Sequence, residues 1–259
     1  MTLAGIGYKN VELKWDSFNP DEPMAEQLVR ARRIAGEEGL RVSNFVILRD
    51  VIDPTRREQG IRDVTAYLRA VAEAGVPVLN LVSGRIPEGM SVDQAWTNVL
   101  SGFEEYVRVA EECQVTLAFE CIVGQLIHDY YTTREFLRHF DSEYLGLTLD
   151  PSHYQLYRND IPWTIRQCGD KIKHVHVKDA VGSLGELGVD FLFPILGEGA
   201  IDWNEFFGAL EGIGYDGALS VEFESFKYAD LVLDDVPRKA AQISWASIQK
   251  IWSHFRSGR

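Results

Sequence analysis

The sequence has little cysteine and no long hydrophobic run. Its three cysteines, Cys113, Cys121 and Cys168, are an odd number and form no C-x-x-C pair. This pattern argues against a disulfide framework and favours a reducing compartment. No apolar segment is long enough to cross a bilayer, and the first ten residues lack the basic start and apolar stretch of a signal peptide. We therefore expect a cytoplasmic protein with no membrane partner.

Positive charge is also scarce, because 26 Lys and Arg face 39 Asp and Glu, for a formal net charge of −13. Since nucleic-acid affinity comes largely from Lys and Arg contacts with phosphate, we expect no nucleic-acid partner. The sequence also lacks a G-x-G-x-x-G motif after its first strand and any P-loop. These absences disfavour a dinucleotide-binding fold and a dedicated phosphate cradle.

Short β-rich segments alternate with helix-like segments along the chain. The predicted strands are residues 11–15, 42–48, 76–82, 115–121, 145–150, 173–178 and 218–224. The predicted helices are residues 22–38, 58–74, 92–113, 132–140, 161–168, 203–213 and 237–256. Such alternation is typical of a parallel sheet with right-handed crossovers.

An open doubly wound sheet and a closed barrel both fit this alternation, but a (β/α)8 barrel usually takes about 250 residues, close to the 259 residues of this chain. We therefore expect an α/β fold, a (β/α)8 TIM barrel forming a single domain over residues 1–259. Only seven strands can be counted, so we expect the first barrel strand to be missing or irregular at the N-terminus.

The later predicted strands carry metal-ligand types at their ends. Bulky apolar residues alternate with small or polar ones, and three of these strands end on Glu120, Asp150 and Glu222, while the strand at 173–178 presents His176 on the equivalent face. A single strand-end acid is most often a solvated residue, but barrel enzymes place their sites at this rim. Three carboxylates and one imidazole suit Mn²⁺, Mg²⁺ or Co²⁺, with Zn²⁺ as a further candidate. We predict one divalent ion at these four residues, with Mn²⁺ preferred.

Other nearby residues have structural interpretations. His174 shares the inward face of His176 but lies one layer deeper, where side chains fill the barrel. Glu12 and Lys14 share one face of the first predicted strand. We expect a structural ion pair there, and the alternative is that both side chains reach the pocket. Trp245 and Trp252 are seven residues apart on the last predicted helix, which places them on one face. Core packing is the preferred interpretation, and a homo-oligomer interface is the alternative.

Several motifs resemble one known family. The segments AFE, LTLDPSH, HVHVKD, LGEGAIDW and GYDGALSVEFE are similar to the sugar phosphate isomerase/epimerase family, the xylose-isomerase-like TIM barrels. The resemblance is strongest over residues 115–224. It implies a single divalent metal held by Glu120, Asp150, His176 and Glu222, and a contact of His153 with substrate or metal. It also implies that the family's first strand precedes the segment GYKNVEL.

The resemblance implies a metal-dependent isomerase or epimerase that moves a proton next to the carbonyl of a sugar, keto sugar or related polyol through an enediolate. In this reading Glu120 and Glu222 are the catalytic acid/base pair, and His153 and Lys178 bind substrate oxygens. Gly182 and Leu126 stand where ketose 3-epimerases often carry Arg and Glu, which argues against close equivalence to that subgroup.

Three alternatives accompany this hypothesis. An inosose-type dehydratase, a lyase, would use the same metal site, and a non-catalytic sugar-binding barrel would retain only the pocket. A DNA-repair enzyme like endonuclease IV is disfavoured, because the six histidines are too few for a three-zinc cluster. Without a phosphate cradle, a phosphate-free small carbohydrate is the preferred partner. The Gly-containing segment 183–199 is either a cover over the mouth or an ordinary connection.

Overall fold

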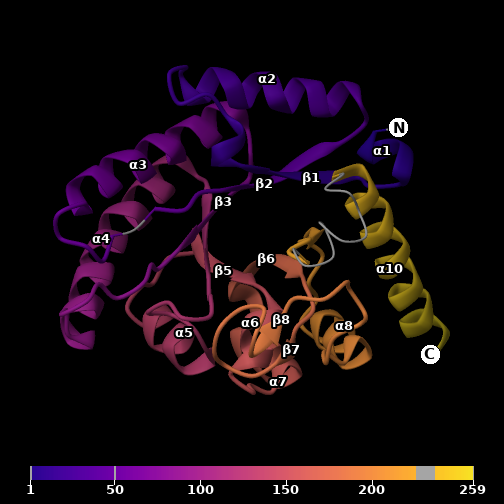
Figure 1. The fold of residues 1–259 in the computed structure, drawn as a ribbon. Coiled ribbons are helices and arrows are strands. Elements are labelled where there is room, and N and C mark those ends of the chain that lie inside the picture. The colour runs from indigo at the N-terminus through magenta and orange to yellow at the C-terminus, as the bar shows by residue number, and fades with distance from the viewer. Residues whose placement is uncertain (1, 50, 226–236, 259) are drawn as a thin grey trace.

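The computed structural model describes residues 2–49, 51–225 and 237–258. Seven parallel strands curve into a nearly closed barrel with helices around it (Figure 1). In the order in which they pair, the strands are β1 (Asn10–Lys14), β2 (Arg41–Val46), β3 (Val78–Val82), β4 (Thr116–Glu120), β5 (Leu145–Leu149), β6 (Ile172–Val177) and β9 (Leu219–Val221). The predicted TIM-barrel fold and its seven main strands are confirmed.

The predicted helices are also present, with ends that differ by a few residues. They are α2 (Met24–Glu37), α3 (Arg57–Ala74), α4 (Val92–Cys113), α5 (Tyr130–Leu137), α7 (Ile161–Cys168), α8 (Trp203–Gly212) and α10 (Pro237–Ser257). The short helix α6 (Pro151–Leu156) was not predicted, and a further short helix, α1 (Leu3–Ile6), precedes β1. Among the described residues, no helix is both long and apolar enough to span a membrane.

The barrel is open between its first and last strands. β1 and β9 are the two ends of the pairing order, and no strand lies between them in the described part of the chain. Beside this opening α1 and α10 lie next to each other (Figure 1). There the rings of Tyr8 and Trp245 lie 4.9 Å apart, and Trp252 packs 5.1 Å from Phe207 of α8. The two tryptophans of the last helix thus pack against the core, as predicted.

The apolar core lies between the strands and the helices. Phe119 of β4 lies 4.5 Å from Phe136 of α5, which in turn lies 4.7 Å from Phe103 of α4 (ring centroids). All three side chains are fully buried. Since successive strand residues point to opposite faces, the polar residues between these apolar ones face the interior of the barrel.

The segment after β6 contains a small antiparallel pair, β7 (Val181–Gly182) and β8 (Phe191–Leu192). Asp179 fixes the chain that follows it, because Oδ2 accepts hydrogen bonds from the backbone of Gly197 and Gly199 at 2.9 and 3.1 Å and from Trp203 Nε1 at 3.2 Å. A Cβ atom at position 199 would overlap the Asp179 carboxylate. Hydrogen bonds to Asp179 therefore hold part of this connection in a defined conformation.

Candidate active site

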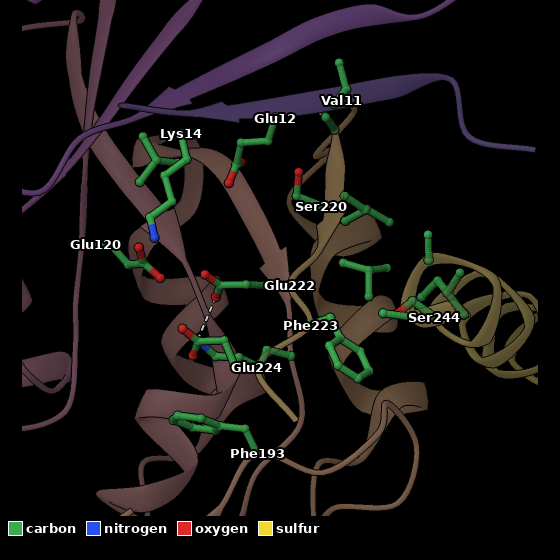
Figure 2. Close-up of a pocket in the computed structure, with 18 of the residues that line it drawn as sticks. Val11, Glu12, Lys14, Glu120, Phe193, Ser220, Glu222, Phe223, Glu224 and Ser244 are labelled. Carbon is green, nitrogen blue, oxygen red and sulfur yellow. Dashed lines mark hydrogen bonds and ion pairs between the residues drawn. The ribbon is translucent and has the colours of Figure 1, made fainter. Parts of the chain in front are cut away.

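Four ligand-type side chains converge at the C-terminal rim of the barrel. Glu120 ends β4, Asp150 follows β5, His176 lies in β6 and Glu222 follows β9. One ligand atom from each lies within 4.8 Å of the others. Figure 2 shows the carboxylates of Glu120 and Glu222 directed into the same space. The structure thus brings together the four residues that the sequence suggested as metal ligands.

Glu120 and His176 form one side of the cluster. His176 Nδ1 lies 3.0 Å from Oε1 of Glu120, and Asn80 Nδ2 donates to Oε2 of Glu120 at 3.1 Å. Burial raises the pKa of Glu120, although His176 opposes this effect. Burial alone would lower the pKa of His176, but the carboxylates of Glu12 and Glu120 raise it well above its usual value. This histidine therefore sits in a strongly negative environment.

Lys178 occupies the centre of the other side. Its ammonium lies 2.8 Å from Asp150, 2.6 Å from Glu222 and 2.9 Å from Glu224. Burial would raise the pKa of Asp150, but the attraction of Lys178 outweighs it and lowers that pKa to about 2. In the same way Asp150 and Glu222 overcome burial and raise the pKa of Lys178. The three carboxylates thus stabilise the positive charge of the Lys178 ammonium.

His153 lies beside the same carboxylates. Its Nε2 is 3.4 Å from Oδ2 of Asp150 and 3.9 Å from Oε1 of Glu120. Burial and the neighbouring Lys178 lower the pKa of His153 to about 4, so its ring is neutral at physiological pH. The ring of Phe193 lies 5.6 Å from His153 and 4.7 Å from the Lys178 ammonium. A neutral imidazole here can donate to or accept from a substrate oxygen.

The expected ion pair between Glu12 and Lys14 is wrong. Lys14 pairs with Asp16 at 3.0 Å, whereas Glu12 lies 2.7 Å from Nε2 of His174 and 3.2 Å from Nε2 of His176. Glu12 is therefore part of the polar cluster. The alternative expectation, that both side chains reach the pocket, is confirmed, because Glu12 and Lys14 line the same cavity as Glu120 and Glu222.

Glu224 was missed by the sequence reasoning, which stopped at Glu222. The two residues are separated by one position, so both point toward the same side of the extended chain. Figure 2 shows their carboxylates together near Phe193. Burial raises the pKa of Glu224, although Lys178 opposes this shift. The period of two that led to Glu222 was also sufficient to find Glu224.

Part of the cluster lines a cavity of about 1160 Å³, while Asp150 and His176 are not among its lining residues. The polar residues that line it include Glu120, His153, Lys178 and Glu222, and the apolar ones include Leu187. The volume of this cavity is large enough for a small-molecule substrate. Three carboxylates and one imidazole within reach of a common point also form a donor set that fits a divalent cation.

Two curated proteins illustrate what this chain is similar to in sequence. D-psicose 3-epimerase of Enterocloster bolteae is 23% identical over 239 residues, which cover 85% of this chain and 74% of that protein. Inosose dehydratase of Halalkalibacterium halodurans is 26% identical over 146 residues, 52% of this chain and 48% of that protein. These two relatives are thus an epimerase and a dehydratase.

Structural comparison gives the same fold. A crystal structure of the IolI protein with a bound zinc atom has a TM-score of 0.78 and 18% identity, and covers 98% of this chain and 92% of its own. At this identity the likeness shows the fold alone. The profile of the xylose isomerase-like TIM barrel matches residues 2–247. Because this match spans nearly the whole sequence, the chain belongs to the xylose isomerase-like TIM barrel family.

Proposed function

We propose that this chain is a divalent-metal-dependent isomerase or epimerase of a sugar, keto sugar or related polyol. One observation carries the proposal. One ligand atom each of Glu120, Asp150, His176 and Glu222 lies within 4.8 Å of the others at the rim of the barrel. The adjoining cavity is also lined by His153 and Lys178. The relatedness to a sugar epimerase and to an inosose dehydratase supports a carbohydrate substrate.

The four converging residues would hold one divalent ion. Their oxygen-rich donor set favours Mn²⁺, with Mg²⁺, Co²⁺ and Zn²⁺ as alternatives. When bound there, such an ion supplies Lewis-acid polarisation of substrate oxygens. The Lys178 ammonium already lies against Asp150 and Glu222, so the site is built to stabilise positive charge.

The protein's own groups would move the proton. Glu120 and Glu222 follow strands that are three apart in the sheet order, so they can act on a substrate from different sides. One carboxylate would remove the proton next to the carbonyl and the other would return it.

His153 and Lys178 would bind the oxygens of the substrate. Proton removal next to a carbonyl places negative charge on the neighbouring oxygen, which preorganised donors stabilise. The Lys178 ammonium and the neutral His153 ring lie 3.5 Å apart at the site. Lys178 would therefore offer a charged donor, and His153 an imidazole, to the same part of the substrate. Phe193 packs against both and shields them from water.

Dehydration is the second candidate, and relatedness to an inosose dehydratase favours it. The same carboxylate would remove the proton, and a β-hydroxyl would leave. A non-catalytic sugar-binding barrel would keep the cavity without either reaction.

Exchange in D₂O separates these functions. The protein, supplied with Mn²⁺, is incubated with a panel of ketoses, inososes and hydroxypyruvate, and products are followed by NMR. Deuterium next to the carbonyl with a changed sugar indicates isomerisation or epimerisation, and loss of water indicates dehydration. Both should cease in EDTA. Neither reaction on any substrate, with no Mn²⁺ bound, would favour the non-catalytic barrel.

A further inference from the structure

His176 lies between carboxylates on both sides of its ring. Its Nδ1 is 3.0 Å from Oε1 of Glu120 and 3.6 Å from Oε2 of Glu222. Its Nε2 is 3.2 Å from each oxygen of Glu12. One ring nitrogen therefore faces the ligand cluster, and the other faces a carboxylate outside that cluster.

Glu12 is itself held in place by further donors. Its Oε2 accepts from Asn44 Nδ2 at 2.9 Å and from His174 Nε2 at 2.7 Å. An ionised carboxylate is an acceptor only, so all three neighbours, His176 included, can donate to it at once. Figure 2 shows Glu12 reaching from β1 toward the interior of the barrel. The orientation of Glu12 is thus fixed before any ligand arrives.

Two irregularities of the sheet create this arrangement. Between β1 and β2 the register skips Ser43, so that Glu12 pairs with Asn44. Between β5 and β6 the register skips Lys173, which moves His174 one residue along β5. Extra residues of this kind re-aim side chains and are frequent near active sites. Each skipped residue directly precedes a residue that contacts Glu12: Ser43 precedes Asn44, and Lys173 precedes His174.

We propose that Glu12 is a positioning residue for His176. By accepting a hydrogen bond from Nε2–H, Glu12 would hold the ring with Nδ1 directed at the space shared with Glu120, Asp150 and Glu222, so that Nδ1 can offer its lone pair when a metal ion replaces the proton there. Hydrogen bonding of the second ring nitrogen commonly fixes the orientation and tautomer of a metal-binding histidine. The proposal rests on the metal site of the proposed function but not on the identity of the substrate.

Two other roles for Glu12 give different results. Glu12 could serve only to tie β1 to β6, in which case its loss would lower stability without a specific effect on the ligand cluster. Alternatively, Glu12, His174 and His176 could themselves hold a second cation, because their ligand atoms also lie within 4.8 Å of one another. In that case Nε2 of His176 would carry no proton.

Zinc affinity tests the positioning role. Glu12→Gln retains the size of the side chain but introduces an amide donor facing three other donors. We expect it to weaken zinc binding about 10- to 100-fold in titration calorimetry, whereas Glu12→Asp, which keeps the charge, should recover part of the loss. Glu26→Gln on the exposed face of α2 is the matched control and should bind like the wild type. Equal affinities of Glu12→Gln and the control would overturn the positioning role.

Histidine NMR of the zinc-loaded wild type supplies a second, independent readout. We expect one zinc per chain and a His176 ring protonated at Nε2 only, with its signals identified by their absence from His176→Asn protein. A second zinc, or an unprotonated Nε2, would overturn the proposal even if Glu12→Gln did not fold. Failure of the wild type to bind zinc would overturn the metal site and the positioning role together, whereas normal zinc binding that is insensitive to Glu12 would overturn the positioning role alone.

Discussion

The ammonium group of Lys178 lies 2.6 Å from Oε2 of Glu222. It also lies 2.8 Å from Asp150, so a single buried cation bridges two of the four candidate metal ligands. If a divalent ion bound at these ligands, the same carboxylates would stabilise both the ion and the Lys178 ammonium. Lys178 and the proposed metal ion would therefore interact with the same carboxylates.

Replacement of Lys178 should make the protein dependent on metal for its stability. Lys178→Met leaves Asp150, Glu222 and Glu224 without their ammonium partner. Because removal of one partner from a buried ion pair costs about 3–5 kcal/mol, we expect a comparable loss of unfolding free energy in EDTA. Mn²⁺ should then restore more stability to the variant than it adds to the wild type.

Urea denaturation with EDTA and with Mn²⁺ measures this difference. Lys250→Met, at an exposed position of α10, is the control and should unfold like the wild type under both conditions. If Mn²⁺ stabilised Lys178→Met no more than the wild type, Lys178 and the metal would not share ligands.

Loss of the Glu222 carboxylate should abolish turnover while the fold survives. Glu222→Gln preserves shape but cannot accept or return a proton, and general acid–base groups typically contribute 10²- to 10⁴-fold to rate, so we expect a loss of about that size. The rate of deuterium exchange on an identified substrate, at saturating Mn²⁺, is the measurement.

Glu224→Gln is the matched comparison for this prediction. Glu224 contacts the same ammonium at 2.9 Å but does not belong to the four-residue ligand cluster. We expect a smaller loss of exchange than in Glu222→Gln. Wild-type exchange in Glu222→Gln would contradict the acid/base assignment.

Asp179 should be important for stability rather than for the chemistry. Its carboxylate accepts hydrogen bonds from the backbone of Gly197, Gly199 and Ile201 and from the Trp203 indole. Asp179→Ala would leave three buried donors unpaired, the backbone N–H groups of Ala180 and Ile201 and the Trp203 indole N–H, each at a cost of about 1–3 kcal/mol. We expect a total loss of at least about 3 kcal/mol in urea denaturation. A loss below about 1 kcal/mol, the size of a single ordinary hydrogen bond, would contradict this role.

The three cysteines should differ in reactivity. Burial raises the pKa of Cys168 to about 12 and raises the pKa of Cys121 further. Since the thiolate is the reactive form, both thiols should resist iodoacetamide at pH 8 in the folded protein. Cys113 is partly exposed and should be alkylated first. Peptide mass spectrometry before and after denaturation measures the order, and early modification of Cys121 would contradict it.

The sequence pattern predicted much of the fold. Apolar residues with a period of two identified the strands, and Glu120, Asp150 and Glu222 were found because each follows the polar face of its strand to the end. Parallel strands in a barrel have their carboxyl ends at one rim. The convergence of these residues therefore follows from the order of the elements and needs no knowledge of individual contacts.

Other features depended on how the barrel closes. Glu12 and His176 are 164 positions apart in the sequence, and their contact requires two register shifts that no local pattern displays. The expected partner of Glu12 was Lys14, two residues away, because local alternation shows only which residues share a face.

The amino-acid sequence by itself determined the alternating elements, the face of each strand and the ligand types at the rim, because these follow from local periodicity. Only the tertiary structure decided that Lys178 bridges Asp150 and Glu222 and that Glu12 faces His176. Such pairings depend on strand register and on distances across the barrel, which are set when the strands assemble around a common core.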